Sequence, residues 1–570
     1  MTMRSPRPWL DQYPDGVAAD LGPAPFPSLV HLLEDAFERH AQRDQLLFMG
    51  QALTFAEVDA QSRAIGAWLQ SLGLEPGARV ALMMPNVPQM VVSLAAVLRA
   101  GYVVVNVNPL YTPRELSHQL VDSGAEAIVI LENFAATLAP VIAQTRVRHV
   151  LVTQLGDALP AVKRWLINSV VRHVKKLIPA WSLPERAGHT LARWPDALAA
   201  GRGMTLNRVS PGPDDLAFLQ YTGGTTGVSK GAMLHHRNVV ANIAQCESWF
   251  SPITRRHSEP MTGVCALPLY HIFALTICFM LGARLGQRMV LVPNARDIAG
   301  TIKTLASVRF HLFPAVNTLY NALMDHPDIK TVDFSALAIS MGGGMAVQQA
   351  TAQRWLALTG CPIVEGYGLS ETSPVACANR VDVKDYTGAI GYPMPSTEIA
   401  IRDDDGRDVP HGTAGEICIR GPQVMSGYWQ RPDETALVLD AEGWFRSGDI
   451  GTMDENGQVR IVDRKKDMIL VSGFNVYPNE IEQVVSLMPG VAECAAVGMP
   501  DPRSGEAVRL CIVRRDPKLS EEDVAAWCRE QLTAYKRPHV IEFHATLPKT
   551  NVGKILRREL RDKPPLAKAA

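Results

Sequence analysis

The stretch Thr222-Gly223-Gly224-Thr225-Thr226-Gly227-Val228-Ser229-Lys230-Gly231 lies between two apolar runs, 216–219 and 232–234. Its glycines allow several backbone N–H groups to point at one anion. Its hydroxyl groups add hydrogen-bond donors, and Lys230 adds a mobile positive charge. A Walker A loop has Gly-Lys-Ser/Thr at the start of a helix, whereas here Lys230 follows Ser229. The stretch therefore predicts a polyphosphate-binding loop of a different kind, with a flexible turn between two strands as the alternative.

Upstream of this loop, short apolar segments alternate with helical ones. The runs 79–84 and 102–105 are typical of buried strands, and residues 33–38 and 87–100 are typical of helices. Strands that alternate with helices form largely parallel sheets that are covered on both faces. This pattern predicts an α/β fold with sheet subdomains in a large N-terminal domain.

Downstream of the loop, the sequence pattern changes twice. Between 388 and 448, glycine and proline recur among short alternating runs, which predicts a small β-rich subdomain. The charged run 463–467 then precedes about a hundred residues with mixed strand and helix patterns, a length that suits a small separate domain. We therefore expect an N-terminal domain over 1–463 and a small mobile α+β C-terminal domain over 464–570, joined by a hinge near 463–467.

The composition of the 570-residue chain, with 47% hydrophobic and 20% charged residues, is that of a globular enzyme. A net charge of −1 argues against nucleic acid as a principal partner, because nucleic-acid binding usually requires a basic surface. Nine scattered cysteines without a Cys-x-x-Cys pair favour reduced thiols over disulfides or a zinc site. No signal peptide is evident, so we expect a cytoplasmic protein.

Residues 264–283 carry no Asp, Glu, Lys or Arg and are long enough to suggest a transmembrane helix. However, Pro268, Tyr270 and His271 lie inside the run, and its beginning is typical of a strand. We interpret it as a buried strand and helix that line a pocket.

Residues 161–181 combine an apolar face at helical spacing with a basic one. The apolar positions are Val162, Trp165, Leu166, Val170, Val174, Leu177, Ile178 and Trp181, and the basic ones are Lys163, Arg164, Arg172, Lys175 and Lys176. A basic amphipathic helix bounded by tryptophans can lie in the interface of an anionic membrane. The alternative is an ordinary surface helix packed on the sheet. We expect peripheral contact with the inner face of the cytoplasmic membrane.

Five ordered motifs in the chain resemble those of the AMP-forming acyl-CoA synthetase superfamily of adenylate-forming enzymes. They are residues 221–231, 367–372, 444–449, 463–482 and 548–560. Two segments, 106–115 and 471–482, are similar to the bacterial long-chain fatty acyl-CoA synthetases within it. The resemblance covers nearly the whole chain, and five motifs in order are far more specific than any one of them.

The resemblance implies ATP-dependent activation of a medium- to long-chain fatty acid. The acid would form acyl-AMP with release of pyrophosphate, and CoA would then take the acyl group, which makes the enzyme an acid–thiol ligase of fatty acid metabolism. ATP and CoA are the implied co-substrates and Mg²⁺ the implied cofactor. Alternatives are a CoA ligase for aryl or branched acids and an acyl-AMP ligase that loads a carrier protein. A non-catalytic nucleotide-binding scaffold is a further alternative, which the presence of Lys554 and Glu371 disfavours.

The resemblance also assigns residues to ATP. It places Tyr221, Thr222, Gly223, Gly224, Thr225, Thr226, Gly227 and Lys230 in the phosphate loop, Gly342, Gly343, Gly344, Glu365, Gly366, Tyr367, Gly368 and Ser370 around the nucleotide, and Asp449 and Arg464 at the ribose or phosphate. Glu371 and Thr222 are the implied Mg²⁺ ligands. Taken singly, Glu371 also fits a carboxylate at a helix start, Asp449 a turn former and Tyr367 a core tyrosine.

The resemblance also implies three catalytic residues and a hinge. Lys554 would bridge the substrate carboxylate and the α-phosphate, and His271 would lie beside the acyl carboxylate, although a satisfied core histidine is the competing interpretation. Glu371 completes the catalytic set through the metal. Lys466 matches the family's hinge position, and Gly473 lies in the segment that would admit the CoA thiol after the small domain rotates. Leu275 stands where one relative has a gating tryptophan.

Overall fold

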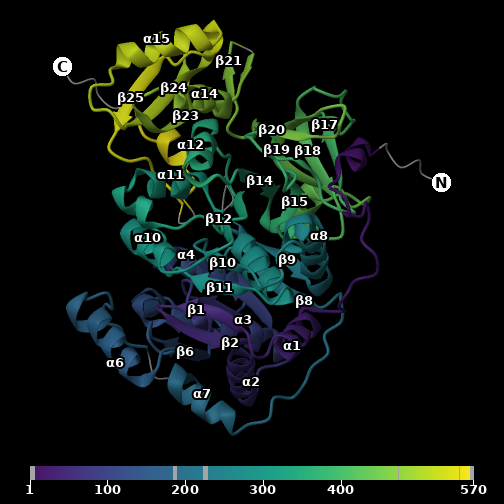
Figure 1. Cartoon of the computed structure of the whole chain (residues 1–570), viewed down its shortest axis with the longest axis vertical. Helices are drawn as coiled ribbons and strands as arrows, with labels where there is room; N and C mark the ends of the chain where they lie inside the picture. Colours follow the sequence, from purple (N-terminus) through teal and green to yellow (C-terminus); the bar gives the residue numbers. More distant parts are fainter. Residues whose placement is uncertain (1–6, 184–188, 223–228, 473, 551–552, 565–570) are drawn as a thin grey trace.

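The structure, a computed structural model, describes residues 7–183, 189–222, 229–472, 474–550 and 553–564 (Figure 1). The first sheet runs in the order β7-β6-β5-β3-β4-β8-β9. Its strands are β3 (Arg79–Met83), β4 (Val103–Asn106), β5 (Ala127–Leu131), β6 (His149–Thr153), β7 (Thr190–Arg193), β8 (Leu216–Thr222) and β9 (Lys230–His235). All pair in parallel except β9, which is antiparallel to β8. The loop after Thr222 therefore joins two paired strands at one edge of this sheet.

A second, larger sheet runs in the order β16-β15-β14-β13-β12-β10-β11-β1-β2. Its strands are β1 (Asp44–Phe48), β2 (Gln51–Thr54), β10 (Thr262–Cys265), β11 (Arg288–Leu291), β12 (Leu312–Ala315), β13 (Ile339–Gly342), β14 (Ile363–Gly368), β15 (Val375–Ala378) and β16 (Tyr392–Pro393). Its centre, from β14 to β1, is parallel. Parallel strands place their carboxyl ends at one edge, which is where ligands bind in α/β folds.

Two smaller sheets complete the fold. The antiparallel sheet β17 (Glu398–Arg402), β18 (Gly415–Arg420), β19 (Phe445–Met453) and β20 (Val459–Arg464) is the expected β-rich subdomain. The last sheet contains β21 (Ile469–Val471), β22 (Phe474–Val476), β23 (Val491–Asp501), β24 (Gly505–Arg514) and β25 (Val540–His544), and it has a hydrophobic core of its own. These observations confirm the predicted fold class.

The helices cover the sheets, and several begin with clear sequence signals. They are α1 (Leu29–Arg39), α2 (Phe55–Ser71), α3 (Pro88–Arg99), α4 (Pro113–Ser123), α5 (Ala135–Leu138), α6 (Ala161–Ser169), α7 (Trp194–Arg202), α8 (His236–Thr254), α9 (Leu281–Arg284), α10 (Ile298–Ala306), α11 (Asn317–Asp325), α12 (Gln349–Thr359), α13 (Pro432–Val438), α14 (Pro478–Ser486), α15 (Glu521–Gln531) and α16 (Arg557–Arg561). Capping boxes Thr54/Glu57 and Thr112/Glu115 start α2 and α4. Every residue of α3 is buried, which explains its apolar sequence.

The run 264–283 folds as predicted, into the end of β10 followed by a π-helical turn, η5 (Ala274–Met280), and α9. In the parts of the chain that the structure describes, no helix has both the length and the hydrophobicity needed to span a bilayer. The strand and helix instead line a cavity that is described below.

The amphipathic segment 161–181 is a shorter helix than its sequence pattern predicts. It comprises α6 and a π-helical turn, η4 (Val170–Val174), and then leaves the helical path. Lys176 has a φ of 51°, and Pro179 follows three residues later, so the helix cannot continue. Trp181 lies outside the helix, where its indole N–H donates to Glu132 at 3.3 Å. In Figure 1, α6 lies at the opposite end of the molecule from the last sheet.

Candidate active site

Many of the residues assigned from the sequence meet in one pocket, between the carboxyl ends of the large sheet's strands, the β-rich sheet and the last segment of the chain. The assigned residues that line it are Gly342, Gly344, Glu365, Gly366, Tyr367, Gly368, Asp449, Arg464 and Lys554. They come from five separate parts of the sequence, so the fold itself assembles this site. Burial raises the pKa of Glu365 to about 8.

The three-glycine segment that ends β13 allows close backbone approach at the edge of this pocket. Gly344 has a φ of +77°, which favours glycine. A Cβ atom on Gly343 would lie 3.0 Å from the Phe273 ring and 3.3 Å from the carbonyl oxygen of Gly366. A side chain at Gly343 would press on Phe273 and on the Gly366 backbone, and one at Gly344 would strain the main chain.

Tyr367, Asp449 and Arg464 form a connected group in the pocket. The Tyr367 hydroxyl donates to Asp449 Oδ2 at 2.7 Å, and Arg464 Nε lies 3.3 Å from Asp449 Oδ1. Tyr367 and Asp449 are both buried. Burial, with the nearby Asp449 charge, holds the pKa of Tyr367 well above its usual range. The carboxylate is thus fixed with one oxygen facing a hydroxyl and the other facing a cation.

Glu371 is a buried carboxylate held by a residue that the sequence interpretation missed. Its Oε1 accepts a hydrogen bond from the Tyr428 hydroxyl at 2.7 Å, and burial raises its pKa. Among the described residues, no cationic side chain lies within ion-pair distance of Glu371. The Lys230 ammonium lies 5.1 Å from the centre of the Tyr428 ring and pairs with Glu434. Tyr428 therefore links Lys230 to the buried carboxylate.

Lys554 and His271 lie near one another although 283 positions separate them in the sequence. Desolvation in the pocket lowers the pKa of Lys554 to about 7, and the Arg464 charge acts in the same direction. Desolvation also lowers the pKa of His271 to about 4, and the Lys554 charge contributes to this shift. His271 is therefore neutral at physiological pH, whereas the pKa of Lys554 lies close to physiological pH.

The turn that carries Lys554 is fixed on both sides. Its backbone N–H donates to Thr550 Oγ1 at 3.0 Å, and the Gly553 carbonyl accepts from the Thr318 hydroxyl of α11 at 3.1 Å. Gly553 has a φ of +82°, and a Cβ atom there would lie 2.4 Å from Thr318 Oγ1. Only glycine allows this close contact between the turn and the large domain.

Arg557, three residues after Lys554, is a second residue that the sequence interpretation left out. Its guanidinium pairs with Asp463 at 3.1 Å, Asp467 at 3.2 Å and Glu482 at 2.7 Å. Asp463 is completely buried. The cluster therefore fixes the end of the chain against the segment around Lys466, whose carbonyl also accepts from Arg561. Its sequence signal was only a pair of arginines in a basic C-terminal segment.

Several assigned residues lie outside this pocket or outside the described part of the chain. The Tyr221 hydroxyl donates to Asp122 Oδ2 at 2.7 Å, and Arg431 pairs with Asp122 Oδ1 at 2.6 Å, so Tyr221 anchors β8 to α4. Ser370 begins the short turn that carries Glu371, and Thr222 pairs with Lys230 in the β8–β9 ladder. Gly223, Gly224, Thr225, Thr226, Gly227 and Gly473 lie outside the described residues.

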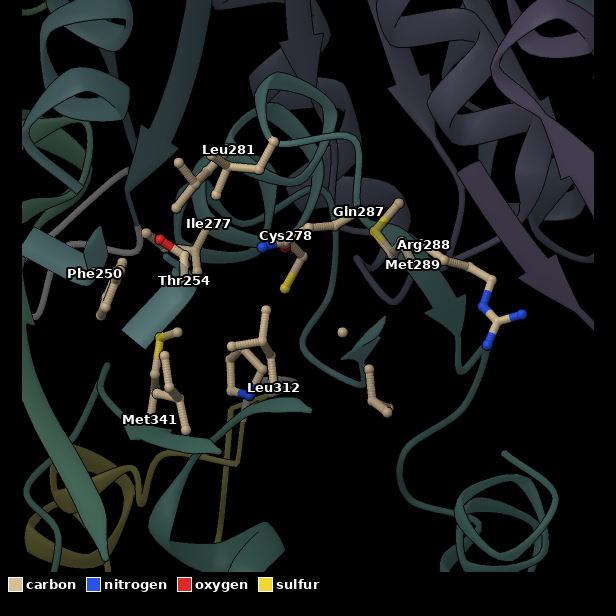
Figure 2. A pocket seen from close by; sticks show the side chains of 15 residues that line it. Phe250, Thr254, Ile277, Cys278, Leu281, Gln287, Arg288, Met289, Leu312 and Met341 are labelled. Atoms are coloured by element: carbon tan, nitrogen blue, oxygen red, sulfur yellow. The ribbon is translucent and has the colours of Figure 1, made fainter. Parts of the chain in front are cut away.

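An apolar cavity lies behind the pocket, between the large sheet, α8 and the π-helical turn (Figure 2). Its lining includes Ile277 and Leu281 from the run 264–283, and Met341 at the near end. Met341 immediately precedes Gly342 of the pocket. Strand β13 thus contributes Met341 to the cavity and Gly342 to the pocket. Leu275 is buried but is not part of this lining.

Comparisons with known proteins find relatives that match nearly the whole chain. The model of the AMP-binding enzyme family matches residues 33–429, and that of the AMP-binding enzyme C-terminal domain matches 480–554. The long-chain-fatty-acid–CoA ligase of Escherichia coli O6:H1 is 52% identical over 97% of this chain and 98% of its own, and that of Bacillus subtilis is 38% identical over 98% of each. The crystal structure of ATP-bound MatB from Rhodopseudomonas palustris has a TM-score of 0.79 and 27% identity, over 94% of this chain and 98% of its own.

Proposed function

The chain belongs to the AMP-binding enzyme family, and we propose that the pocket around Lys554 is where it converts a long-chain fatty acid to its CoA thioester at the expense of ATP. That overall reaction is the one that its relatives at about 50% identity carry in their names. The observation that carries the assignment is the convergence of Lys554, Asp449 and His271 from distant parts of the chain. ATP and CoA would use this site one after the other.

The chemistry explains why a cation must enter this pocket. A carboxylate is a poor acyl donor, because its leaving group would be oxide or hydroxide. Attack on the α-phosphate of ATP turns that oxygen into part of AMP, which departs readily. Two anions must approach one another in this step, so fixed positive charge and oriented donors lower the barrier. We assign this charge to Lys554, with Arg464 beside it and the loop 222–231 on the phosphates that leave as pyrophosphate.

The donor set fits Mg²⁺, which prefers one or two protein oxygens together with phosphate oxygens and water. Glu371 is a buried carboxylate whose described partner is a hydroxyl, and burial without a counter-ion destabilises its charged form. A bound divalent cation would restore that balance and neutralise charge on the phosphates. We propose Glu371 and Thr222 as the residues that hold it, with Tyr428 keeping the carboxylate oriented.

The ribose and base have matching partners in the pocket. We propose that Asp449 accepts the ribose hydroxyls and that the Tyr367 ring packs on adenine, with its hydroxyl holding Asp449 in place. The glycines 342–344 and residues 365–368 supply the surrounding backbone, and Ser370 supplies a hydroxyl. His271, being neutral, would offer a hydrogen bond to the acyl carboxylate without competing with Lys554 for its charge.

The function is tested by measuring AMP release from ATP with a panel of C4 to C18 carboxylic acids, with and without CoA. We expect turnover to require both CoA and a long alkyl chain, because the cavity behind the pocket is apolar. Preference for aryl or branched acids would indicate a CoA ligase for such acids. Acyl-AMP formation without CoA-dependent turnover would favour transfer to a carrier protein. The absence of any ATP turnover would leave a non-catalytic nucleotide-binding scaffold as the remaining alternative.

The domain division is part of the same proposal. We place the boundary at 463/464, with the hinge at 463–467, because β20 ends at Arg464 and the next strand, β21, belongs to the last sheet. In this structure Lys554 lies in the pocket, as adenylate formation requires. Rotation about Lys466 would withdraw Lys554 and bring the segment around Gly473 to the same site for the second half-reaction.

We also propose that α6 and the residues after it contact an anionic membrane. Val162, Trp165 and Val174 are 80%, 71% and 70% exposed, which is unusual for apolar side chains grouped on one short segment. Lys175 and Lys176 lie beside them and are exposed. Glu132, buried under the segment, pairs with Arg172 at 2.6 Å and with Arg193 at 2.8 Å, so the segment is attached firmly to the large domain.

Replacing Trp165 with glutamate is expected to lower binding to phosphatidylglycerol vesicles at least tenfold in a co-sedimentation assay. Burying a large apolar side chain in the membrane interface contributes about 2 kcal/mol, which exceeds a factor of ten in partitioning. The matched control is Leu437→Glu, since Leu437 in α13 is 74% exposed but lies apart from the basic residues. Unchanged binding after Trp165→Glu, or after reversal of Lys175 and Lys176 to glutamate, would exclude this contact.

A further inference from the structure

The segment 265–270, which runs on from the end of β10, is held by a buried asparagine. Asn86 lies between β3 and α3 and is 2% exposed. Its Nδ2 donates to the carbonyls of Cys265 at 2.9 Å and Leu267 at 2.8 Å, and its Oδ1 accepts from the Leu269 N–H at 2.8 Å. One side chain therefore fixes the backbone of the segment at three alternate residues.

A second buried amide fixes the last residue of this segment. Gln220 lies on β8, and its Nε2 donates to the Tyr270 carbonyl at 2.9 Å. Its Oε1 accepts from Asn106 Nδ2 at 3.0 Å. The two bonds together fix the orientation of the Gln220 amide, because a flipped amide would lose both of them. The strand that leads into the loop 222–231 is thus hydrogen-bonded directly to the residue before His271.

Asn106 is a costly residue for a core position. It begins the segment 106–115, is buried, and has a side-chain Oδ1 without a hydrogen-bond partner among the described residues. A buried oxygen that lacks a partner destabilises the fold. Core stability therefore does not explain this asparagine, whereas the orientation that its Nδ2 imposes on Gln220 does.

The His271 ring is oriented by contacts within its own turn. Its backbone N–H donates to the Pro268 carbonyl at 2.9 Å, and its Nδ1 accepts from the Phe273 N–H at 3.3 Å. Because Nδ1 is an acceptor, the proton of the neutral ring lies on Nε2. The Nε2–H group is then the donor for an acyl carboxylate, and its direction depends on where the segment 265–270 places this turn.

We propose that Gln220 and Asn86 are positioning residues for adenylate formation, which fix the backbone before His271 and so aim its Nε2–H at the acyl carboxylate. A donor that is fixed in advance needs no reorganisation when the carboxylate attacks. Gln220 also connects this donor to β8, so the carboxylate and the phosphates are held from one strand. The inference rests on the proposed function, because it concerns the carboxylate end of the same site.

The test is a double-mutant cycle between Gln220 and His271, measured as fatty-acid-dependent exchange of pyrophosphate into ATP. Gln220→Met keeps the length of the side chain but removes both hydrogen bonds. We expect it to lower kcat/KM for the acid by about tenfold or more, since a misplacement of about 1 Å can cost about a hundredfold. KM for ATP should change less than about twofold. In a His271→Ala background, Gln220→Met should have no further effect, because the group that it positions is gone.

Gln245→Met is the matched control, because it also removes a buried amide that holds a carbonyl. Gln245 lies in α8, is completely buried, and donates to the Pro395 carbonyl at 2.7 Å. This variant should lower the melting temperature and leave kcat/KM for the acid unchanged. If Gln220→Met does not fold, Asn106→Ala takes its place in the cycle, since it leaves Gln220 present but removes the donor that orients it. Asn86→Leu should likewise have no further effect once His271 is alanine.

Two results would overturn the inference. One is additive effects of Gln220→Met and His271→Ala on kcat/KM, and the other is a lower melting temperature of Gln220→Met with unchanged kinetics. If His271→Ala itself left the exchange unaffected, the role proposed for His271 would be wrong, and the inference would fall with it. Absence of fatty-acid-dependent exchange in the unaltered protein would instead refute the proposed function.

Discussion

Replacing Lys554 with alanine is expected to reduce acyl-adenylate formation by a hundred- to a thousandfold, about the effect of removing one preorganised donor to a developing charge. Lys554 is the cation that the last segment of the chain brings into the pocket beside Asp449 and His271. Without it, the carboxylate and the α-phosphate must approach with less compensation of their charges. The measurement is fatty-acid-dependent exchange of pyrophosphate into ATP.

The same variant should retain thioester formation from acyl-AMP that is supplied ready-made, because we propose that Lys554 has left the site by that step. Arg558→Ala is a matched control: Arg558 lies four residues away, its side chain is 65% exposed, and its recorded ion pair is with Asp562. Near-normal pyrophosphate exchange in Lys554→Ala would show that the assignment of Lys554 is wrong.

The pH dependence follows from the depressed pKa of Lys554. The pocket disfavours the charged form and lowers the pKa from 10.5 to about 7, so the required ammonium is lost as pH rises through 7. We therefore expect kcat/KM for adenylation, which reports the free enzyme, to fall about tenfold per pH unit above that value. Bound ATP favours the ammonium, so the corresponding limb of kcat should lie at higher pH. Lys554→Arg, always charged, should abolish the limb even where its geometry lowers the rate.

Much of the fold could be predicted because the decisive segments are locally unambiguous. The run 80–84 is apolar throughout, as a parallel strand buried on both faces must be, and most of it lies in β3 (Arg79–Met83). The alternating runs between 388 and 448 likewise predict the antiparallel sheet that contains β17 and β18. In each case the periodicity and the neighbouring glycines or prolines carry the information, and the rest of the chain is not needed to interpret it.

The residues that were missed depend on contacts across the sequence. Tyr428 contacts Glu371 only because the segment that contains it pairs with β9, through a bridge between Tyr428 and Ala232, beside the turn at 370–372. The early end of the helix at 174 is only partly of this kind: Pro179 is visible in the sequence, whereas the hydrogen bond of Trp181 to Glu132, 49 residues away, is not. Neither contact can be inferred from the sequence alone.

Replacing Lys466 with proline is expected to preserve adenylate formation and to lower thioester formation about a hundredfold, the effect of holding reacting groups out of place. Proline fixes φ near −65°. The link between β20 and β21 must change its backbone angles if the last sheet is to rotate. The two half-reactions are measured separately, as pyrophosphate exchange and as acyl-CoA formed from pre-made acyl-AMP.

The control for this variant is Lys466→Ala, which removes the same side chain but leaves the backbone free to rotate. If the side chain itself mattered, both variants would lose thioester formation, and the hinge assignment would be wrong. Equal loss of the two half-reactions in Lys466→Pro would also contradict it. The ion pairs of Arg557 with Asp463, Asp467 and Glu482 also bear on the position of the hinge. Because Asp463 and Asp467 lie on either side of Lys466, a rotation there must rearrange the cluster, and adenylation alone should be insensitive to that rearrangement.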